Sequence, residues 1–374
     1  VKKVYVMKIN CSKALLVEAV SNVSRAVSPK SPIPALEGIL IKAANNSVTL
    51  TGYDLELGIV TSVEADVKEA GEVVIPAKLL LDIIRKIPSG NILISTDEKQ
   101  LAVIKGAAAE FTILGIPAED YPELPAVDEE SSLVMKQGTL KSMIDQTLFA
   151  IATTDSKPVH TGSLFDVKQE NITIVSVDGY RLALRREPFI CDQEISFIVP
   201  GKTLSEISKL VKEEDGEVAM IVSHKHIIFK IGGYLVVSRL LEGEFLDYNA
   251  AIPKAAKTTV SINTRQLMEG IERTSLLISD RLRSPIKLNI GDDKIKISCS
   301  TTIGKAYDEV DCQIDGEGVN MGFNNKYLLD ALKASDCDMV KLEINGALSP
   351  MRVVPLKGES FLFLVLPVRV KNDD

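Results

Sequence analysis

The residues best able to carry out acid–base, nucleophilic or metal chemistry do not form a catalytic pattern in this chain. The sequence holds no GxSxG, no GxxxxGK[ST] and no HExxH motif. His160, His224 and His226 have no nearby cysteine or HExxH context, so metal binding is not expected. Acidic runs at 128–130 and 213–217 are typical of solvated loops rather than of a paired acid–base site. We therefore predict a protein without enzymatic activity, metal ion or cofactor.

The cysteines, the segment at 224–226 and the glycine-rich stretch at 230–234 are each explained by a structural role rather than by chemistry. The five cysteines are odd in number and contain no CxxC, which favours reduced, mostly buried side chains over disulfides or a zinc site. The segment His224-Lys225-His226 is expected to lie on one face of a strand. The glycine-rich stretch at 230–234 is expected to form a tight hairpin turn.

Lysine and arginine side chains offer a different chemistry, because they bind phosphates without reading a base sequence. Three lysines recur at equal intervals of 124 residues: Lys78, Lys202 and Lys326. An acid follows each after four residues, at Asp82, Glu206 and Asp330, which predicts a lysine and an acid on one exposed helix face. The net charge of −8 means that any contact with nucleic acid must come from a local basic surface.

The elements that carry these lysines recur as well. Each lysine follows a short apolar strand and opens an amphipathic helix. An earlier helical pattern belongs to each copy, at 12–26, 139–152 and 264–278. Short alternating strands fill the rest, which favours an antiparallel α+β module with two helices on one face of its sheet.

Proline-containing linkers at 121–125 and 252–254 separate the copies. The chain is therefore predicted to hold three modules of one fold, at 7–127, 128–253 and 254–374. A module of this size is roughly 30–35 Å across. Six of them, from two chains, would close into a ring with a hole on the order of 30 Å, which is wide enough for duplex DNA. A head-to-tail dimer is a natural closed solution for a three-module chain.

Several segments, taken together, resemble the bacterial DNA polymerase III beta subunit family, the replicative sliding clamps, over residues 7–370. They are SPIPAL at 31–36, YPELP at 121–125, VDGYRLA at 177–183, EGEFLDY at 242–248 and LPVR at 366–369. The resemblance implies a homodimeric ring of six similar clamp modules that encircles duplex DNA and tethers the replicative polymerase to its template. The family is non-catalytic.

The resemblance also implies a hydrophobic pocket between the second and third modules. It would take linear clamp-binding motifs of the replicative polymerase, the clamp loader and repair factors. Its wall would comprise Lys157, His160, Val177, Gly179, Tyr180, Arg181, Leu182, Leu246, Ala251, Tyr327, Pro350, Leu364, Val365, Leu366, Pro367, Val368 and Arg369. The apolar run FLFLVLPV near the end of the chain fits this role, since such a run either pairs into a sheet or serves a partner.

Two more sets of residues follow from the same resemblance. Those that would face DNA are Lys30, Lys78, Lys157, Lys202 and Arg283. Those that would form the dimer seam are Phe111 and Ile113 of one chain against Leu277 and Ile278 of the other.

Two alternatives compete with a DNA-encircling scaffold: a monomeric peptide-binding scaffold and an unrecognised enzyme. A ring dimer would have a mass near 81 kDa, twice the 40.7 kDa of the chain. No apolar run approaches the roughly 20 residues that cross a bilayer, so we expect no membrane association and a cytoplasmic protein. Residues 1–6 precede Met7, whose MKIN reads as a natural start, and are expected to lie outside the fold.

Overall fold

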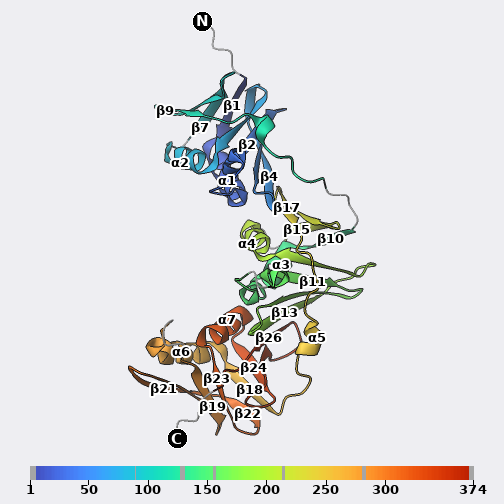
Figure 1. The fold of residues 1–374 in the computed structure, drawn as a ribbon, viewed down its shortest axis with the longest axis vertical. Helices are drawn as coiled ribbons and strands as arrows, with labels where there is room; N and C mark the ends of the chain where they lie inside the picture. Colours follow the sequence, from blue (N-terminus) through green and yellow to red (C-terminus); the bar gives the residue numbers. More distant parts are fainter. Residues whose placement is uncertain are drawn as a thin grey trace. The chain divides into compact units, whose positions relative to one another are not determined.

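The computed structural model describes residues 6–88, 90–126, 131–154, 157–212, 215–279 and 284–369. The chain divides into two compact units, residues 1–140 with 206–240, and residues 141–205 with 241–374. Each unit holds two antiparallel sheets with helices packed against them (Figure 1). No helix in the described part of the chain is long and apolar enough to span a bilayer.

The first unit contains a five-stranded and an eight-stranded sheet. The five-stranded sheet has the order β5 (Asp66–Glu69), β1 (Met7–Ser12), β7 (Asn91–Thr96), β8 (Leu101–Gly106), β9 (Ala109–Leu114). The eight-stranded sheet has the order β10 (Ser131–Lys136), β15 (Glu217–Val222), β16 (His226–Ile231), β17 (Tyr234–Arg239), β4 (Leu57–Glu64), β3 (Ser47–Tyr53), β2 (Gly38–Ala44), β6 (Gly71–Pro76). Helices α1 (Lys13–Val23) and α2 (Ala77–Lys86) lie side by side in this unit (Figure 1).

The second unit contains a nine-stranded and a four-stranded sheet. The nine-stranded sheet has the order β14 (Ile195–Pro200), β11 (Gly162–Val167), β12 (Asn171–Val177), β13 (Arg181–Pro188), β26 (Phe361–Val365), β25 (Met351–Pro355), β24 (Met339–Ile344), β18 (Thr258–Asn263), β22 (Gln313–Gly316). The four-stranded sheet has the order β21 (Gly304–Asp311), β20 (Lys294–Thr301), β19 (Ile286–Gly291), β23 (Val319–Phe323). Its helices are α5 (Tyr248–Ala251), α6 (Thr264–Thr274) and α7 (Asn325–Ser335), and α3 (Gln137–Asp145) and α4 (Gly201–Leu210) cross the unit boundary.

The threefold repeat is present in the elements as it is in the sequence. Helices α2, α4 and α7 begin at residues 77, 201 and 325, which are 124 residues apart. Strands β3, β12 and β20 end at 53, 177 and 301, again 124 apart. The earlier helices α1, α3 and α6 each run into a short 3₁₀ turn: η1 (Ser24–Ala26), η4 (Leu148–Ala150) and η6 (Ser275–Leu277). The predicted helical patterns are therefore confirmed.

Helix α7 illustrates why these segments are helical. The Asn324 side chain accepts hydrogen bonds from the backbone N–H groups of Lys326 and Tyr327, at 3.0 and 3.4 Å, and so caps the first turn. Leu328, Ala331 and Leu332 follow at helical spacing, and all are buried in the core of the second unit. The helix ends where Asp336 adopts a left-handed conformation, with φ of 49°.

The structure confirms one local prediction, the hairpin at 230–234, and contradicts another, the strand at 224–226. The glycine-rich hairpin is confirmed, since Gly232 and Gly233 connect β16 to β17 with φ of 55° and 82°. The placement of the histidine pair on a strand is wrong. Only His226 belongs to β16, while His224 and Lys225 form the turn that precedes it, closed by a 2.9 Å bond from Ser223 N–H to the His226 carbonyl.

The expectation that most of the five cysteines are buried is also wrong. Cys11 and Cys299 are buried, Cys191 and Cys312 are half-buried, and Cys337 is exposed. All five are free thiols, as predicted. Burial raises the pKa of the Cys11 thiol, so it stays protonated at neutral pH.

Candidate functional site

The segment after β26 forms an apolar surface beside the start of β13. Strand β26 pairs with β13, with Arg181 opposite Val365. Beyond this pair, Leu366 N–H donates to the Tyr180 carbonyl at 2.9 Å. Val368 N–H then donates to the Gly322 carbonyl at 2.8 Å. Backbone hydrogen bonds therefore hold the tail to two elements, the turn before β13 and strand β23.

Four large apolar side chains are exposed around this tail: Tyr180 at 62%, Leu246 at 41%, Leu366 at 38% and Val368 at 43%. Ala251, at the end of α5, is exposed as well. Large exposed apolar side chains gathered in one place indicate a surface that another molecule covers. We call this set of exposed side chains, Tyr180, Leu246, Ala251, Leu366 and Val368, the tail groove, because we expect a partner segment to lie along it.

Other residues that the sequence assigned to this site are buried beneath it. Val177, Leu182 and Leu364 belong to one apolar cluster under α5, with exposed fractions of 5%, 3% and 2%. Val365 is fully buried in the main core of the second unit. Lys157 and Arg369 are exposed, and Pro350 and Pro367 are half-buried. The buried side chains support the groove, and the exposed ones can meet a partner.

Helix α5 is fixed on the sheet by a tyrosine. Tyr248 is 6% exposed and donates its hydroxyl to Asp166 Oδ2 at 2.6 Å. Burial, together with this carboxylate, raises the pKa of Tyr248 to about 12, so the hydroxyl remains a donor at neutral pH. The linker that carries Leu246 and Ala251 is therefore positioned by a hydrogen bond as well as by packing.

Arg181 organises the floor of the tail groove. Its Nε donates to Asp178 at 2.9 Å and its Nη1 to Asp330 of α7 at 2.6 Å, with only 9% of the side chain exposed. Its guanidinium also lies over the Tyr327 ring, 4.5 Å from the centroid. Tyr327 in turn stacks on Tyr180, with ring centroids 5.9 Å apart. One arginine thus ties β13 to α7 and supports the aromatic pair.

Asp178 and Gly179 set the direction of this arginine. Asp178 Oδ1 accepts hydrogen bonds from the N–H groups of Tyr180 and Arg181, at 2.9 and 3.1 Å. Gly179 has φ of 90°, a conformation that a residue with a side chain rarely adopts. The DGYR segment is therefore a turn that exposes Tyr180 and buries Arg181.

Sequence reasoning missed Asp178 and Asp330 as parts of the site. It expected the acids of the repeated helices on an exposed face, which holds only for Asp82. Glu206 is 9% exposed and lies 2.7 Å from Lys209 and 3.7 Å from Arg25. Asp330 is half-buried against Arg181. Both acids meet an arginine of the preceding module, and no local pattern predicts that contact.

His160 lies at the edge of the same region, 9% exposed. Its ring meets Phe245 edge-on, with centroids 5.4 Å apart. Burial, and then the positive charge of Lys157, lower the pKa of His160 below its usual 6.5. The imidazole is therefore neutral in the folded protein at neutral pH.

The lowered pKa of His160 predicts a pH-dependent stability. The unfolded chain binds the proton more readily than the folded one, so stability is complete above pH 6.5 and falls as pH drops below it. Titration of the His160 ring by NMR should give a pKa below 6.5. Replacing His160 by Gln should reduce the loss of stability between pH 7 and 5. His226, whose pKa is also lowered by burial, should account for part of the loss that remains.

Two of the basic residues assigned to a DNA-facing surface, Lys78 and Lys202, occupy equivalent positions. Together with Lys326, the third lysine of the repeat, each is the second residue of its helix, in α2, α4 and α7, and all three are exposed. Lys30 and Lys157 are exposed in loops. Arg283 lies outside the residues that the structure describes.

Two sheets end in strands that carry exposed apolar side chains. Strand β9 is the last of the five-stranded sheet and presents Phe111, 37% exposed, and Leu114, 68% exposed. Strand β21 is the last of the four-stranded sheet, with Ile303, 70% exposed, just before it. Of the residues assigned to a dimer seam, Ile113, Leu277 and Ile278 are half-buried. Leu276, which sequence reasoning missed, is 83% exposed.

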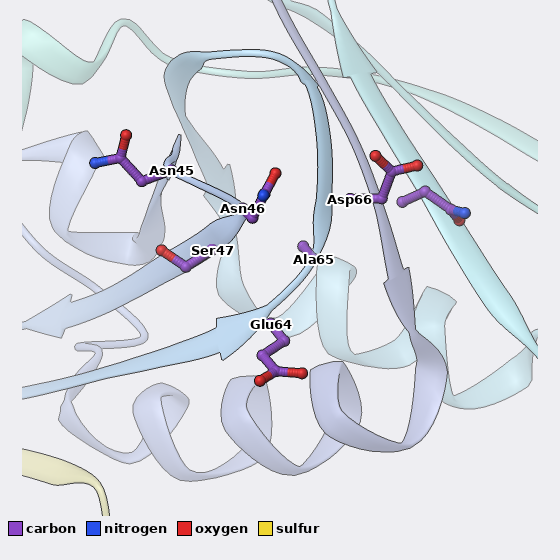
Figure 2. A pocket seen from close by; sticks show the side chains of 7 residues that line it. Asn45, Asn46, Ser47, Glu64, Ala65 and Asp66 are labelled. Atoms are coloured by element: carbon purple, nitrogen blue, oxygen red, sulfur yellow. The ribbon is translucent and has the colours of Figure 1, made fainter.

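A polar hollow in the first unit offers no comparable site. It is lined by Asn10, Asn45, Asn46, Ser47, Glu64, Ala65 and Asp66. Figure 2 shows the carboxylates of Glu64 and Asp66 well apart from each other. Asp66 is also paired with Lys68, at 2.9 Å. Within the described residues no cluster of three or more His, Cys, Asp or Glu side chains could hold a metal ion.

Three family models cover nearly the whole chain in sequence order. They describe the N-terminal domain of the DNA polymerase III beta subunit over residues 7–125, its central domain over 134–247 and its C-terminal domain over 249–369. The chain belongs to the DNA polymerase III beta subunit family. It is accordingly a beta sliding clamp, a non-catalytic factor that confers processivity on DNA polymerase III.

Individual members of the family are similar along their full length. The beta sliding clamp of Bacillus subtilis is 33% identical over 376 residues, covering 97% of this chain and 100% of the relative. That of Staphylococcus aureus is 31% identical over 374 residues, covering 97% and 99%. The crystal structure of the Bacillus subtilis sliding clamp matches with a TM-score of 0.94 at 32% identity, covering 98% of this chain and 100% of that one. The Pseudomonas aeruginosa beta subunit matches with a TM-score of 0.92 at 28% identity, covering 97% and 100%.

Proposed function

We propose that two copies of this chain close head to tail into a ring of six modules around duplex DNA, with module boundaries at 7–127, 128–253 and 254–374. In bacteria that work takes place in the cytoplasm. The observation that carries the proposal concerns β9 and β21, each of which has one edge without a partner among the described strands. The equivalent strands of the other modules use that edge to pair at the two module seams within the chain.

The two seams within the chain are built alike. In the first unit, β4 of the first module pairs with β17, the last strand of the second. In the second unit, β13 of the second module pairs with β26, the last strand of the third. By position in the repeat, β21 is the third member of the series β4, β13, β21, and β9 is the first member of the series β9, β17, β26. A β21–β9 pair between two chains would repeat the same seam and satisfy both free edges.

The registers of the two seams predict the register of the third. Leu57 is opposite Ser238 in the first seam, and Arg181 is opposite Val365 in the second. The hairpins β3–β4, β12–β13 and β20–β21 can be aligned by their cross-strand pairs, and this alignment makes Ile303 equivalent to Leu57 and Arg181. The same alignment of β16–β17 with β8–β9 makes Ile113 equivalent to Ser238. We therefore expect Ile303 opposite Ile113 of the partner subunit, an apolar cross-strand pair.

The 3₁₀ turns support the same seam. The middle residue of η1, Arg25, contacts Glu206 of α4, in the next module. The middle residue of η4, Phe149, packs edge-on against Phe363 of the third module, with centroids 5.3 Å apart. The middle residue of η6 is Leu276. We expect it to pack on α2 of the partner subunit, where Leu79 is 43% exposed.

The tail groove is the site at which partners attach. Linear segments of the replicative polymerase, the clamp loader and repair factors would insert apolar side chains between Leu246, Leu366 and Val368. Burial of one such side chain contributes about 1.5–3 kcal/mol, so two anchors give a moderate affinity that lets partners exchange.

Removing the exposed tail tests this assignment. Chain termination after Val365 keeps β26 intact but removes Leu366 and Val368, so a fluorescent clamp-binding peptide of the polymerase should bind at least tenfold more weakly, measured by anisotropy. The sedimentation mass should stay near 81 kDa, twice 40.7 kDa. Ile190→Glu, at a 92% exposed apolar residue outside the groove, is the control and should bind normally. Undiminished affinity of the shortened chain would refute the groove.

The repeated lysines suit contact with the DNA backbone. A lysine beside a helix N-terminus lies against the positive end of the helix dipole, so the position is unfavourable for the helix itself. The same helix end and the lysine together attract a phosphate. A lysine recurs at this unfavourable position in three helices, at Lys78, Lys202 and Lys326, and phosphate binding would explain why.

Charge reversal at Lys78 and Lys202 tests the DNA-facing surface. The complex of the double variant Lys78→Glu and Lys202→Glu with circular DNA should still last longer than its complex with linear DNA. The variant should, however, make fewer contacts with phosphates. The slope of log affinity against log salt should fall by about 0.9 for each contact removed. The control Lys254→Glu with Lys357→Glu makes the same change in net charge at two exposed loop lysines. An equal salt slope in both double variants would contradict the assignment.

A further inference from the structure

A second hollow lies on the same sheet as the tail groove, one row of side chains further along. It encloses about 320 Å³ in the second unit. Leu182 and Leu364 face each other across β13 and β26 beneath the tail groove, and Leu184 and Leu362 are the next pair on that face. Leu184 and Leu362 line the hollow, together with Val354 of β25 and Ile252 of the linker. Its floor is therefore apolar and continuous with the support of the tail groove.

The rim of this hollow carries an excess of positive charge. Arg352 is already neutralised, since it is ion-paired with Glu343 and donates to the Pro253 carbonyl at 2.6 Å. Arg186 and Lys341 are half-buried. Arg186 Nε donates to Thr173 Oγ1 at 3.2 Å, but across the described ranges no carboxylate lies within 4.0 Å of either cation. Glu359, on the turn after β25, is the one other acid in the lining and is exposed.

We propose that this hollow is a second docking pocket, which accepts an acidic side chain with a neighbouring apolar one from the protein segment that flanks the segment bound in the tail groove. The carboxylate would pair with Arg186 and Lys341, which half-burial leaves poorly solvated. The apolar side chain would cover Leu184 and Leu362. The second part of the proposal, that both sites hold one partner, rests on the proposed function of the tail groove.

The spacing of the two sites fits one continuous segment. A strand advances about 3.4 Å per residue, so the pair Leu184–Leu362 lies roughly 7 Å beyond Leu182–Leu364. Two to four extended residues of a bound segment cover such a step. A partner would then gain affinity and selectivity from residues outside its main motif, without a change in the tail groove.

A short probe tests the pocket independently of the tail groove. Acetyl-Asp-Leu-amide should shift the methyl NMR signals of Leu184, Ile252 and Leu362 in the full-length protein, and acetyl-Asn-Leu-amide should shift them at least fivefold less at equal concentration. Lys341→Gln should reduce the response to the acidic probe to that of the neutral one. Lys357→Gln, at an exposed lysine on the adjoining turn outside the lining, should leave it intact. Equal responses to both probes, or a full response in Lys341→Gln, would overturn the pocket.

Extended peptides test whether the two sites serve one partner. A polymerase clamp-binding peptide with an Asp-Leu extension at one end or the other, after a Gly-Ser spacer of two to four residues, should bind about fivefold tighter than the unextended peptide. The gain should vanish in the double variant Arg186→Gln and Lys341→Gln, while the unextended peptide binds that variant normally. No gain with either extension, or a gain that survives in the double variant, would overturn the shared partner. If the unextended peptide does not bind the native protein, the tail groove is refuted instead. The experiment with the short probe then still tests the second docking pocket by itself.

Discussion

A chain with cysteine at both position 113 and position 303 is expected to form disulfide-linked dimers on oxidation. The register carried over from the two internal seams places Ile303 directly opposite Ile113 of the partner subunit. Residues directly opposite in an antiparallel pair bring their Cβ atoms to about 4.5–5.5 Å, close to the separation that a disulfide bridges. Non-reducing electrophoresis should show a species of about 81 kDa, twice 40.7 kDa.

The control for this experiment shifts one cysteine by a single residue. Neighbouring residues of a strand point to opposite faces, so cysteines at 114 and 303 should not cross-link. The complementary double variant Leu276→Asp with Ile303→Asp should dissociate the ring. Each seam loses about 3–6 kcal/mol of apolar burial from the two side chains, so the dimer dissociation constant should rise more than a hundredfold. A stable dimer of this variant would show that the seam lies elsewhere.

Replacement of Arg181 by Ala is expected to destabilise the protein by about 2–4 kcal/mol, because it leaves the half-buried carboxylates of Asp178 and Asp330 without their cation. It also removes the cation beneath the Tyr327 ring, so Tyr180 and the Leu366 backbone lose their support. Affinity for a clamp-binding peptide should therefore fall more than tenfold. Denaturant unfolding and peptide anisotropy measure the two effects.

Two further variants separate charge from geometry at this position. Arg181→Lys keeps the charge but cannot reach Asp178 and Asp330 at the same time, so we expect it to recover only part of the stability. The triple variant Arg181→Met, Asp178→Asn and Asp330→Asn removes all three charges, and it should be more stable than Arg181→Ala. A loss of less than 1 kcal/mol in Arg181→Ala would mean that the ion pairs are not what holds α7 to β13.

The repeat and the local elements could be predicted because they depend on contacts close in sequence. The equal spacing of Lys78, Lys202 and Lys326 places three similar helices, and the structure begins α2, α4 and α7 at the same interval. Apolar residues at helical spacing, such as Leu328 and Leu332 in α7, determine which helix face is buried. The glycines at 232 and 233 make the hairpin turn that their conformational freedom allows.

The partners of the charged residues could not be predicted in this way. Asp82, Glu206 and Asp330 occupy the same position of three similar helices, yet one is exposed, one lies near Arg25 and one is bonded to Arg181. What differs is the neighbour that the preceding module supplies. The exposure of Ile303 and Leu276 could not be predicted either. It depends on β21 being an edge strand, which only the order of strands in the folded sheet reveals.

The sequence by itself therefore determined the module, its threefold copy number and the family, since these are encoded in periodicity and in short motifs such as DGYRLA and LPVR. Only the tertiary structure decided which parts of those motifs reach solvent. In DGYR the turn exposes Tyr180 and buries Arg181. At the end of the last strand Val365 is buried, whereas Leu366, the first residue of LPVR, is exposed. The reason is physical: burial and ion pairing depend on distant strands that meet at a seam, and no local pattern records which residues will meet there.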